Sequence, residues 1–128
     1  MLDVPRVQIA HDLSVSDGDL YIQTHATNPL LKPATIACAL KRFAEDEGEH
    51  DSLFTVNRFQ SRFYDHEGAA INHDPEELLR TQDLPPVYEE NSVLYVFTRE
   101  SFAKRERRIG LAPVIFETPP MESIDIDD

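Results

Sequence analysis

The chain has 128 residues, and its 24 acidic and 12 basic side chains give a formal net charge of −12 at pH 7. That charge disfavours nucleic acid and anionic membrane partners, since both are bound chiefly through Lys and Arg. The length suits a single domain over residues 1–128, and no apolar run approaches the roughly 20 residues of a transmembrane helix. With no signal-peptide pattern either, we expect a soluble, cytoplasmic protein.

The first predicted elements are a short helix and a buried strand. Apolar residues at helical spacing predict a helix within residues 4–13, with Pro5 in its first turn. The turn signal Asp17-Gly18-Asp19 precedes a run of β-formers at residues 20–24, which predicts a strand.

A second helix is predicted after Pro33, where Ile36, Leu40 and Phe43 recur at helical spacing. Gly48 is a natural left-handed cap, so we expect this helix to end near it. Cys38 is the only cysteine of the chain, and its apolar neighbours favour a buried, reduced thiol over a catalytic one.

The remaining elements complete an α/β pattern. Residues 52–56 predict a strand, and strand, helix and strand in this spacing favour a parallel crossover and a mostly parallel sheet. Residues 57–91 lack sustained periodicity and are interpreted as a long functional or interface segment. The nearly continuous apolar run at residues 92–98 predicts a central strand, followed by a short helix at 101–107 and a strand at 113–118.

Three segments could carry chemistry. His25-Ala26-Thr27-Asn28-Pro29-Leu30 follows a strand, where ligands of α/β sheets bind, although an ordinary Asn-Pro turn would look the same. Arg80 and Gln82 lie in a proline-stiffened stretch, and Arg is suited to a phosphate or carboxylate, but a surface loop with an incidental Arg is equally consistent.

The third segment is the C-terminal Asp125-Ile126-Asp127. Residues i and i+2 of an extended chain share one face, and two carboxylates on one face suit Mg²⁺, whereas a solvated acidic terminus is the alternative. The five histidines show no zinc-like spacing, and no serine lies in a Gly-x-Ser-x-Gly elbow, so a hydrolase is disfavoured.

The three segments occur in an order that resembles the acylneuraminate cytidylyltransferase family. Thr27-Asn28-Pro29-Leu30 resembles its Thr-Ser-Pro-Leu element, and Ser123-Ile124-Asp125-Ile126-Asp127 matches its Ser-Ile-Asp-Ile-Asp closing motif. Arg80-Thr81-Gln82-Asp83-Leu84-Pro85-Pro86-Val87-Tyr88, followed by Glu90-Asn91, resembles its Arg-Arg-Gln-Asp-Leu-Pro-Pro-Val-Tyr and Glu-Asn-Gly stretch. Together these matches cover most of the chain.

The resemblance implies a Rossmann-like, three-layer α/β nucleotidyltransferase that joins CMP from CTP to a sugar acid, such as N-acetylneuraminate, and releases pyrophosphate. It implies that sugar-binding residues are His25, Thr27, Asn28, Pro29, Arg80 and Gln82. Asp125 and Asp127 would be catalytic and hold Mg²⁺. The family also uses the region matching residues 57–91 to form a homodimer and complete its neighbour's site.

Departures from the family pattern leave other functions open. His25 stands where Gln is usual, Thr81 where a second Arg is common and Leu31 where an Arg often follows, so the sugar acid is expected to differ. The family's N-terminal strand and its Arg-x-Gly-Ser-Lys-Gly triphosphate loop have no counterpart here, so we expect a fragment that is inactive alone. The alternatives are a non-catalytic sugar-acid-binding or regulatory relative and a transferase using another nucleotide or 3-deoxy sugar acid.

Overall fold

A computed structural model of the chain describes residues 20–45 and 49–124. They form one four-stranded sheet in the order β1-β3-β2-β4. The elements, in chain order, are β1 (Leu20–Thr24), α2 (Pro33–Ala44), β2 (Ser52–Phe59), the 3-10 helix η1 (Thr81–Asp83), β3 (Val87–Thr98), α3 (Arg99–Arg105), β4 (Pro113–Glu117) and the 3-10 helix η2 (Pro120–Ser123). The helix predicted within residues 4–13 lies outside the described residues.

The sheet is mixed, so the prediction of a mostly parallel sheet is not confirmed. β3 pairs antiparallel with both β1 and β2, whereas β2 and β4 pair in parallel. β1 and β2 therefore run in the same direction with β3 inserted between them. The apolar run of β3 predicts burial correctly, but a buried strand has the same pattern in either direction.

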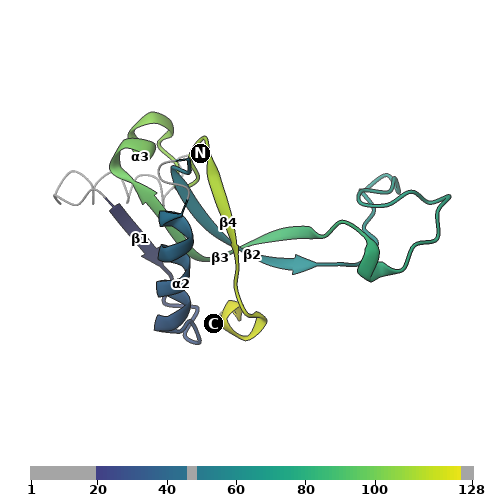
Figure 1. Cartoon of the computed structure of the whole chain (residues 1–128), viewed down its shortest axis with the longest axis horizontal. Helices are drawn as coiled ribbons and strands as arrows, with labels where there is room; N and C mark the ends of the chain where they lie inside the picture. Colours follow the sequence, from purple (N-terminus) through teal and green to yellow (C-terminus); the bar gives the residue numbers. More distant parts are fainter. Residues whose placement is uncertain (1–19, 46–48, 125–128) are drawn as a thin grey trace.

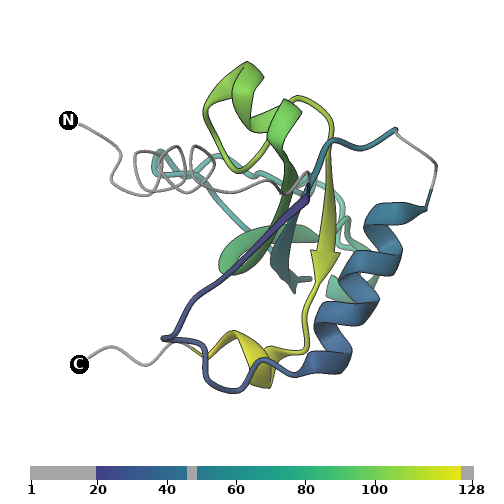
Figure 2. The same cartoon turned by 90° about the vertical axis from the view of Figure 1, so that its left-hand side faces the viewer.

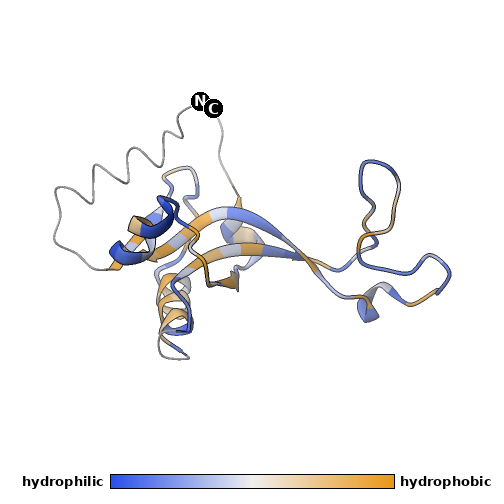
Figure 3. Ribbon diagram, turned by 90° about the horizontal axis from the view of Figure 1, so that it is seen from above, coloured by the Kyte–Doolittle hydropathy of each residue, from blue (hydrophilic) through white to orange (hydrophobic). Residues whose placement is uncertain are grey.

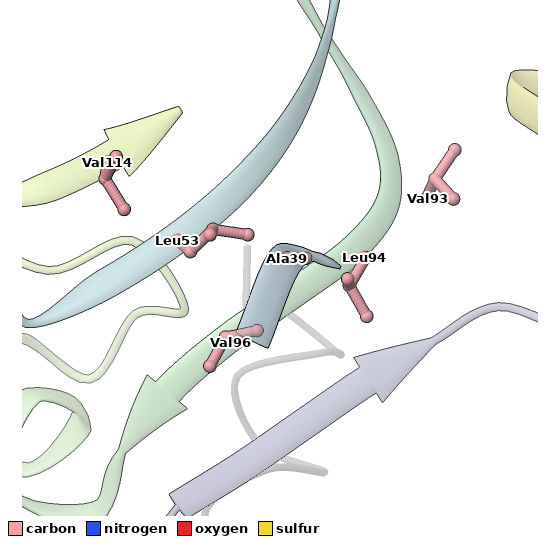
Figure 4. Close-up of a cluster of buried hydrophobic side chains, with 6 residues drawn as sticks. All are labelled: Ala39, Leu53, Val93, Leu94, Val96 and Val114. Carbon is pink, nitrogen blue, oxygen red and sulfur yellow. The ribbon is translucent and has the colours of Figure 1, made fainter. Parts of the chain in front are cut away.

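Helices cover both faces of the sheet (Figure 2). On one face, Ala39 of α2 packs on Leu53, Leu94 and Val96, and Figure 4 shows these side chains close together. On the other face, Phe102 of α3 packs against aromatic residues of β3. Residues 93–97 are consecutively buried because both faces of β3 are covered. This mixed α/β architecture is compatible with a nucleotidyltransferase-like fold.

Helix α2 differs from its prediction in length and in the face that it buries. It ends at Ala44, with Glu45 in extended conformation, because an acidic run is unfavourable at the negative end of a helix dipole. The predicted cap, Gly48, lies outside the described residues. Cys38 is exposed, contrary to the prediction of burial, because α2 packs through Thr35 and Ala39 and Cys38 lies to the side of that packed face.

Residues 57–91 form a projecting arm, and this name is used for them below (Figure 1). The β2 and β3 strands continue into the arm as an antiparallel ladder that ends at the pair Phe59 and Val87. Beyond that pair, residues 60–86 form an irregular loop with η1 and an isolated bridge between Tyr64 and Ala70. The interpretation of residues 57–91 as wholly irregular therefore misses the two strand ends.

None of the helices in the described ranges has the length and apolar character needed to cross a lipid bilayer.

Candidate functional site

The candidate site lies at one edge of the sheet, where β1, β2 and β4 all have their carboxyl ends. The turn after β1, the arm and the segment after β4 all leave the sheet at this edge (Figure 1). Ligands of α/β sheets bind at such strand ends because the chain leaves the ladder there and exposes polar groups. Sequence-distant candidate segments therefore meet at this edge.

The turn after β1 contacts the C-terminal segment directly. Asn28 is 6% exposed, and its side-chain amide Nδ2 donates to the carbonyl oxygen of Ile124 at 3.2 Å. The backbone of the same turn is closed by the Asn28 N–H, which donates to the carbonyl of His25 at 3.1 Å. This contact therefore joins the predicted sugar-binding turn to Ile124, the residue that precedes the predicted metal-binding motif in the sequence. Asp125 and Asp127 themselves lie outside the described residues.

A buried carboxylate anchors the C-terminal segment to the start of α2. Glu122 is 3% exposed, and its Oε1 accepts hydrogen bonds from the Thr35 hydroxyl at 2.6 Å and the Lys32 N–H at 2.7 Å. Burial alone would raise the pKa of Glu122, but these hydrogen bonds and the nearby Lys32 charge outweigh it and lower that pKa. Glu122 thereby serves as a helix cap that is supplied from a distant part of the chain.

A second polar cluster surrounds Tyr95 on the α3 face of the sheet. The Tyr95 hydroxyl donates to Glu90 and lies 3.0 Å from the Ser92 hydroxyl. Burial, and then the hydrogen bond to Glu90, raise the pKa of Tyr95. The His25 ring meets the Tyr95 ring edge-on at 6.3 Å between centroids, and the Arg108 guanidinium lies over that ring at 4.0 Å.

His25 carries an unpaired polar atom in this cluster. Its Nδ1 is buried and has no hydrogen-bond partner in the part of the chain that the structure describes. Buried polar atoms are normally paired, so an orphan at a sheet edge indicates a place for a ligand or water. This is the position at which the resemblance implies a sugar-binding residue.

A hydrogen-bond network joins the arm to the sheet. Asn91 Oδ1 accepts from the Thr55 hydroxyl at 2.6 Å, and its Nδ2 donates to Thr118 Oγ1 at 2.8 Å and Asn57 Oδ1 at 3.1 Å. The next residue, Ser92, has φ of 59°, in the left-handed region, where the register between β2 and β3 shifts. The resembled family has Gly at this position, which fits the backbone conformation.

The predicted residues Arg80 and Gln82 lie on the arm, which projects away from the sheet (Figures 1 and 3). Arg80 Nε donates to Asp83 at 3.0 Å, and the Gln82 carbonyl accepts from the Gln60 amide at 2.7 Å. Both side chains are exposed. Within one chain the structure does not bring them to the turn after β1.

Sequence reasoning missed Glu122, Tyr95 and Arg108. The contacts of Glu122 with Thr35 and Lys32 span about ninety positions of the chain, and no local pattern indicates them. Arg108 lies in a basic run after α3 that has no periodic signal. The motif match could have indicated Tyr95, because it closely follows the Glu90-Asn91 pair.

Comparison with protein families matches the Cytidylyltransferase model to residues 6–123. This match spans most of the chain, so the protein belongs to the cytidylyltransferase family, whose members use CTP for nucleotidyl transfer. Comparison with curated proteins gives no significant match.

Proposed function

We propose that this protein takes part in the transfer of CMP from CTP to the anomeric hydroxyl of a sugar acid, with release of pyrophosphate. The observation that carries the proposal is the hydrogen bond between Asn28 and the Ile124 carbonyl, which joins two of the segments that carry the resemblance at one sheet edge. Membership of the cytidylyltransferase family supports the nucleotide part of the reaction. The sugar-acid part rests on the motif resemblance.

In this proposal the chain positions the reactants. His25, Thr27 and Pro29 line the sugar site, while the buried Asn28 holds the turn that presents them. Positioning is a large part of such catalysis, because the sugar oxygen must attack the α-phosphorus in line with the bond to the departing pyrophosphate. The attacking hydroxyl releases its proton to water, its oxygen forms a bond to the α-phosphorus, and the P–O bond from the α-phosphorus to the departing pyrophosphate breaks, with pyrophosphate keeping the electron pair.

Asp125 and Asp127 are proposed to hold Mg²⁺, whose chemistry is to neutralise phosphate oxygens. Two carboxylates are a suitable donor set for this hard cation when phosphates and water supply the other ligands. Glu122 and Asn28 would support the motif, since they fix the backbone directly before it.

We further propose a homodimer in which each arm reaches the other chain's site. Arg80 and Gln82 lie too far along the arm to serve the site of their own chain, but a second copy could receive them. The arm also exposes large apolar and aromatic side chains, as expected of an interface; they are Phe59, Tyr64, Ile71, Leu78, Leu79 and Tyr88.

The test of this function is ligand binding by the chain, followed by turnover. Titration of the isotope-labelled chain with N-acetylneuraminate or 3-deoxy-octulosonate should shift the amide resonances of His25 and Thr27, whereas glucose should not. Failure of every sugar acid to bind at millimolar concentration would contradict the proposal. Replacing Asp125 and Asp127 with Asn should leave this sugar binding intact and remove magnesium-dependent binding of CTP.

A non-catalytic sugar-acid-binding protein is the second candidate. The 128 residues contain no Arg-x-Gly-Ser-Lys-Gly segment, so by themselves they offer no Gly-rich nest for a triphosphate. We accordingly expect this chain alone to release no pyrophosphate from CTP, Mg²⁺ and a sugar acid. Turnover on the per-second scale of ordinary enzymes would instead establish that these residues suffice for catalysis.

A further inference from the structure

Arg108 is held at the candidate site in an unusual setting. Its guanidinium lies over the Tyr95 ring, 4.0 Å from the ring centroid, and its Nη1 donates to Gln23 Oε1 at 3.2 Å. An arginine that merely covers apolar surface can leave its head group free in water. Here two neighbours from different strands fix the head group, so its orientation is set before any ligand arrives.

Most of the donor capacity of Arg108 is unused. A guanidinium has five N–H donors, and only the bond to Gln23 engages one of them among the described residues. No carboxylate of those residues lies within ion-pair distance of it; Glu90 instead accepts from the Tyr95 hydroxyl at the tip of the ring. The fork of Arg108 is therefore available for a planar anion.

The open donors of Arg108 belong to the same site as the orphaned His25 atom. Both side chains contact the Tyr95 ring, and both residues are half-buried, although the His25 Nδ1 atom itself is buried. A guanidinium with open donors and a ring nitrogen without a partner among the described residues complement the carboxylate and hydroxyl groups of a sugar acid. Arg80, in contrast, is paired with Asp83 on the arm.

We propose that Arg108 is a specificity-determining residue that binds the carboxylate of the sugar acid within a single chain. This inference rests on the proposed function, because it names the group that distinguishes the substrate from a neutral sugar. Stacking on Tyr95 and the hydrogen bond to Gln23 orient the guanidinium of Arg108. The same Tyr95 ring also contacts His25, so the ligand would meet both side chains.

The experiment compares a sugar acid with its own uncharged form. The labelled full chain is titrated with N-acetylneuraminate and with its methyl ester, and both dissociation constants are measured by NMR. Charge-assisted hydrogen bonds to carboxylate support a preference for the free acid of about tenfold or more. Arg108→Gln should reduce that preference to less than about twofold, with Arg108→Lys falling between the two.

The neighbouring Arg107 supplies the matched control, because it is exposed and its replacement changes the net charge equally. Arg107→Gln should keep the preference for the acid. Glu90→Gln removes a nearby negative charge and should raise that preference. A purely structural role of Arg108 would weaken acid and ester alike, so the ratio of their dissociation constants separates the two roles.

Three outcomes would overturn the inference. An Arg108→Gln variant that is folded and keeps the preference shows that another group binds the carboxylate. Equal binding of acid and ester by the unmodified chain would agree with the proposed sugar site but contradict a role of Arg108 in binding the carboxylate. Binding of neither compound refutes the proposed function and this inference together.

Discussion

The sheet and the arm are stabilised by different forces. The sheet buries apolar side chains between two helices, and Leu53, Val93, Leu94 and Val96 have no exposed surface. In the arm loop only Leu84 is buried among the apolar residues. Its order comes instead from polar side chains bonded to backbone: Asn72 Nδ2 donates to the carbonyls of Ser61 at 2.7 Å and Pro85 at 3.1 Å.

Because hydrogen bonds order the arm, its apolar side chains need not be buried within the same chain and can remain exposed for contact with a partner. Arg62 and Gln60 also donate to carbonyls across the arm, so hydrogen bonds set its shape while apolar side chains face outward. A shape that is set before binding reduces the entropy lost on association. The sheet folds around its own core, whereas the arm keeps its apolar surface for another chain.

The largest expected effect is on the sheet core. Leu94→Ala should lower the free energy of unfolding by about 3–5 kcal/mol, because a fully buried leucine leaves a cavity. Leu78→Ala, at a side chain that is 92% exposed on the arm, should change it by less than about 0.5 kcal/mol. Urea denaturation measures the unfolding free energy of both variants. Similar decreases in the two variants would show that the side chains of the arm contribute to stability as much as those of the sheet core.

The next effect concerns the polar anchor of the sheet. Glu122→Ala should cost about 2–3 kcal/mol, because it removes a buried, charge-assisted cap of α2. The lowered pKa of Glu122 means that its contribution is fully present above its ordinary value of 4.5 and is lost as pH falls through the folded-state pKa. Glu122→Gln should therefore flatten the acid side of the stability profile.

The control for this pH dependence is Glu77→Gln, at an exposed site on the arm. Its profile should coincide with that of the unmodified chain. Identical acid sensitivity in the Glu122→Gln variant would assign the loss of stability to other carboxylates.

A smaller effect is expected on association through the arm. Ile71→Glu combined with Leu78→Glu should weaken dimerisation by at least about tenfold, which corresponds to about 1.4 kcal/mol, because charge replaces apolar contact. Leu111→Glu makes a similar change at an exposed site near β4 and should leave the dimer intact. Sedimentation at tens of micromolar distinguishes them; a monomeric unmodified chain would refute the proposed dimer.

The smallest effect is expected at the junction between the two regions. Ser92→Gly relieves left-handed strain of about 1 kcal/mol but loses the contact with the Tyr95 hydroxyl and gains freedom in the unfolded chain. The net change in unfolding free energy should stay within about 0.5 kcal/mol. Ser92→Val should cost more than about 1 kcal/mol, since a β-branched residue tolerates this conformation poorly. Equal stabilities would contradict this account of the conformation.

Local sequence patterns predicted elements better than their arrangement. The strands at residues 20–24 and 113–117 and the buried centre of β3 follow from apolar runs, which depend on near neighbours. The antiparallel direction of β3 depends on the arm, which turns the chain back after β2. The apolar pattern within β3 does not indicate that direction. The exposure of Cys38 depends similarly on which side of α2 meets the sheet.

The candidate site shows the same limit. Motif order indicated the turn at His25 and the C-terminal segment, and the bond from Asn28 to Ile124 connects them. It could not indicate that Arg80 and Gln82 lie on a projecting arm, because motifs carry no distances. Glu122 was missed because its partners lie on a helix far back along the chain.

The arm also has a consequence for how the chain folds. β2 and β3 are paired neighbours in the sheet, yet all of residues 60–86 separate them along the chain. Closing a loop costs entropy that grows only slowly, by about 0.6 kcal/mol for each doubling of its length. Related chains could therefore lengthen or shorten the arm at little cost in stability. The expected effect is on the folding rate. β2 and β3 can pair only after this long loop closes, and the pairing of strands that are distant in the sequence is slow.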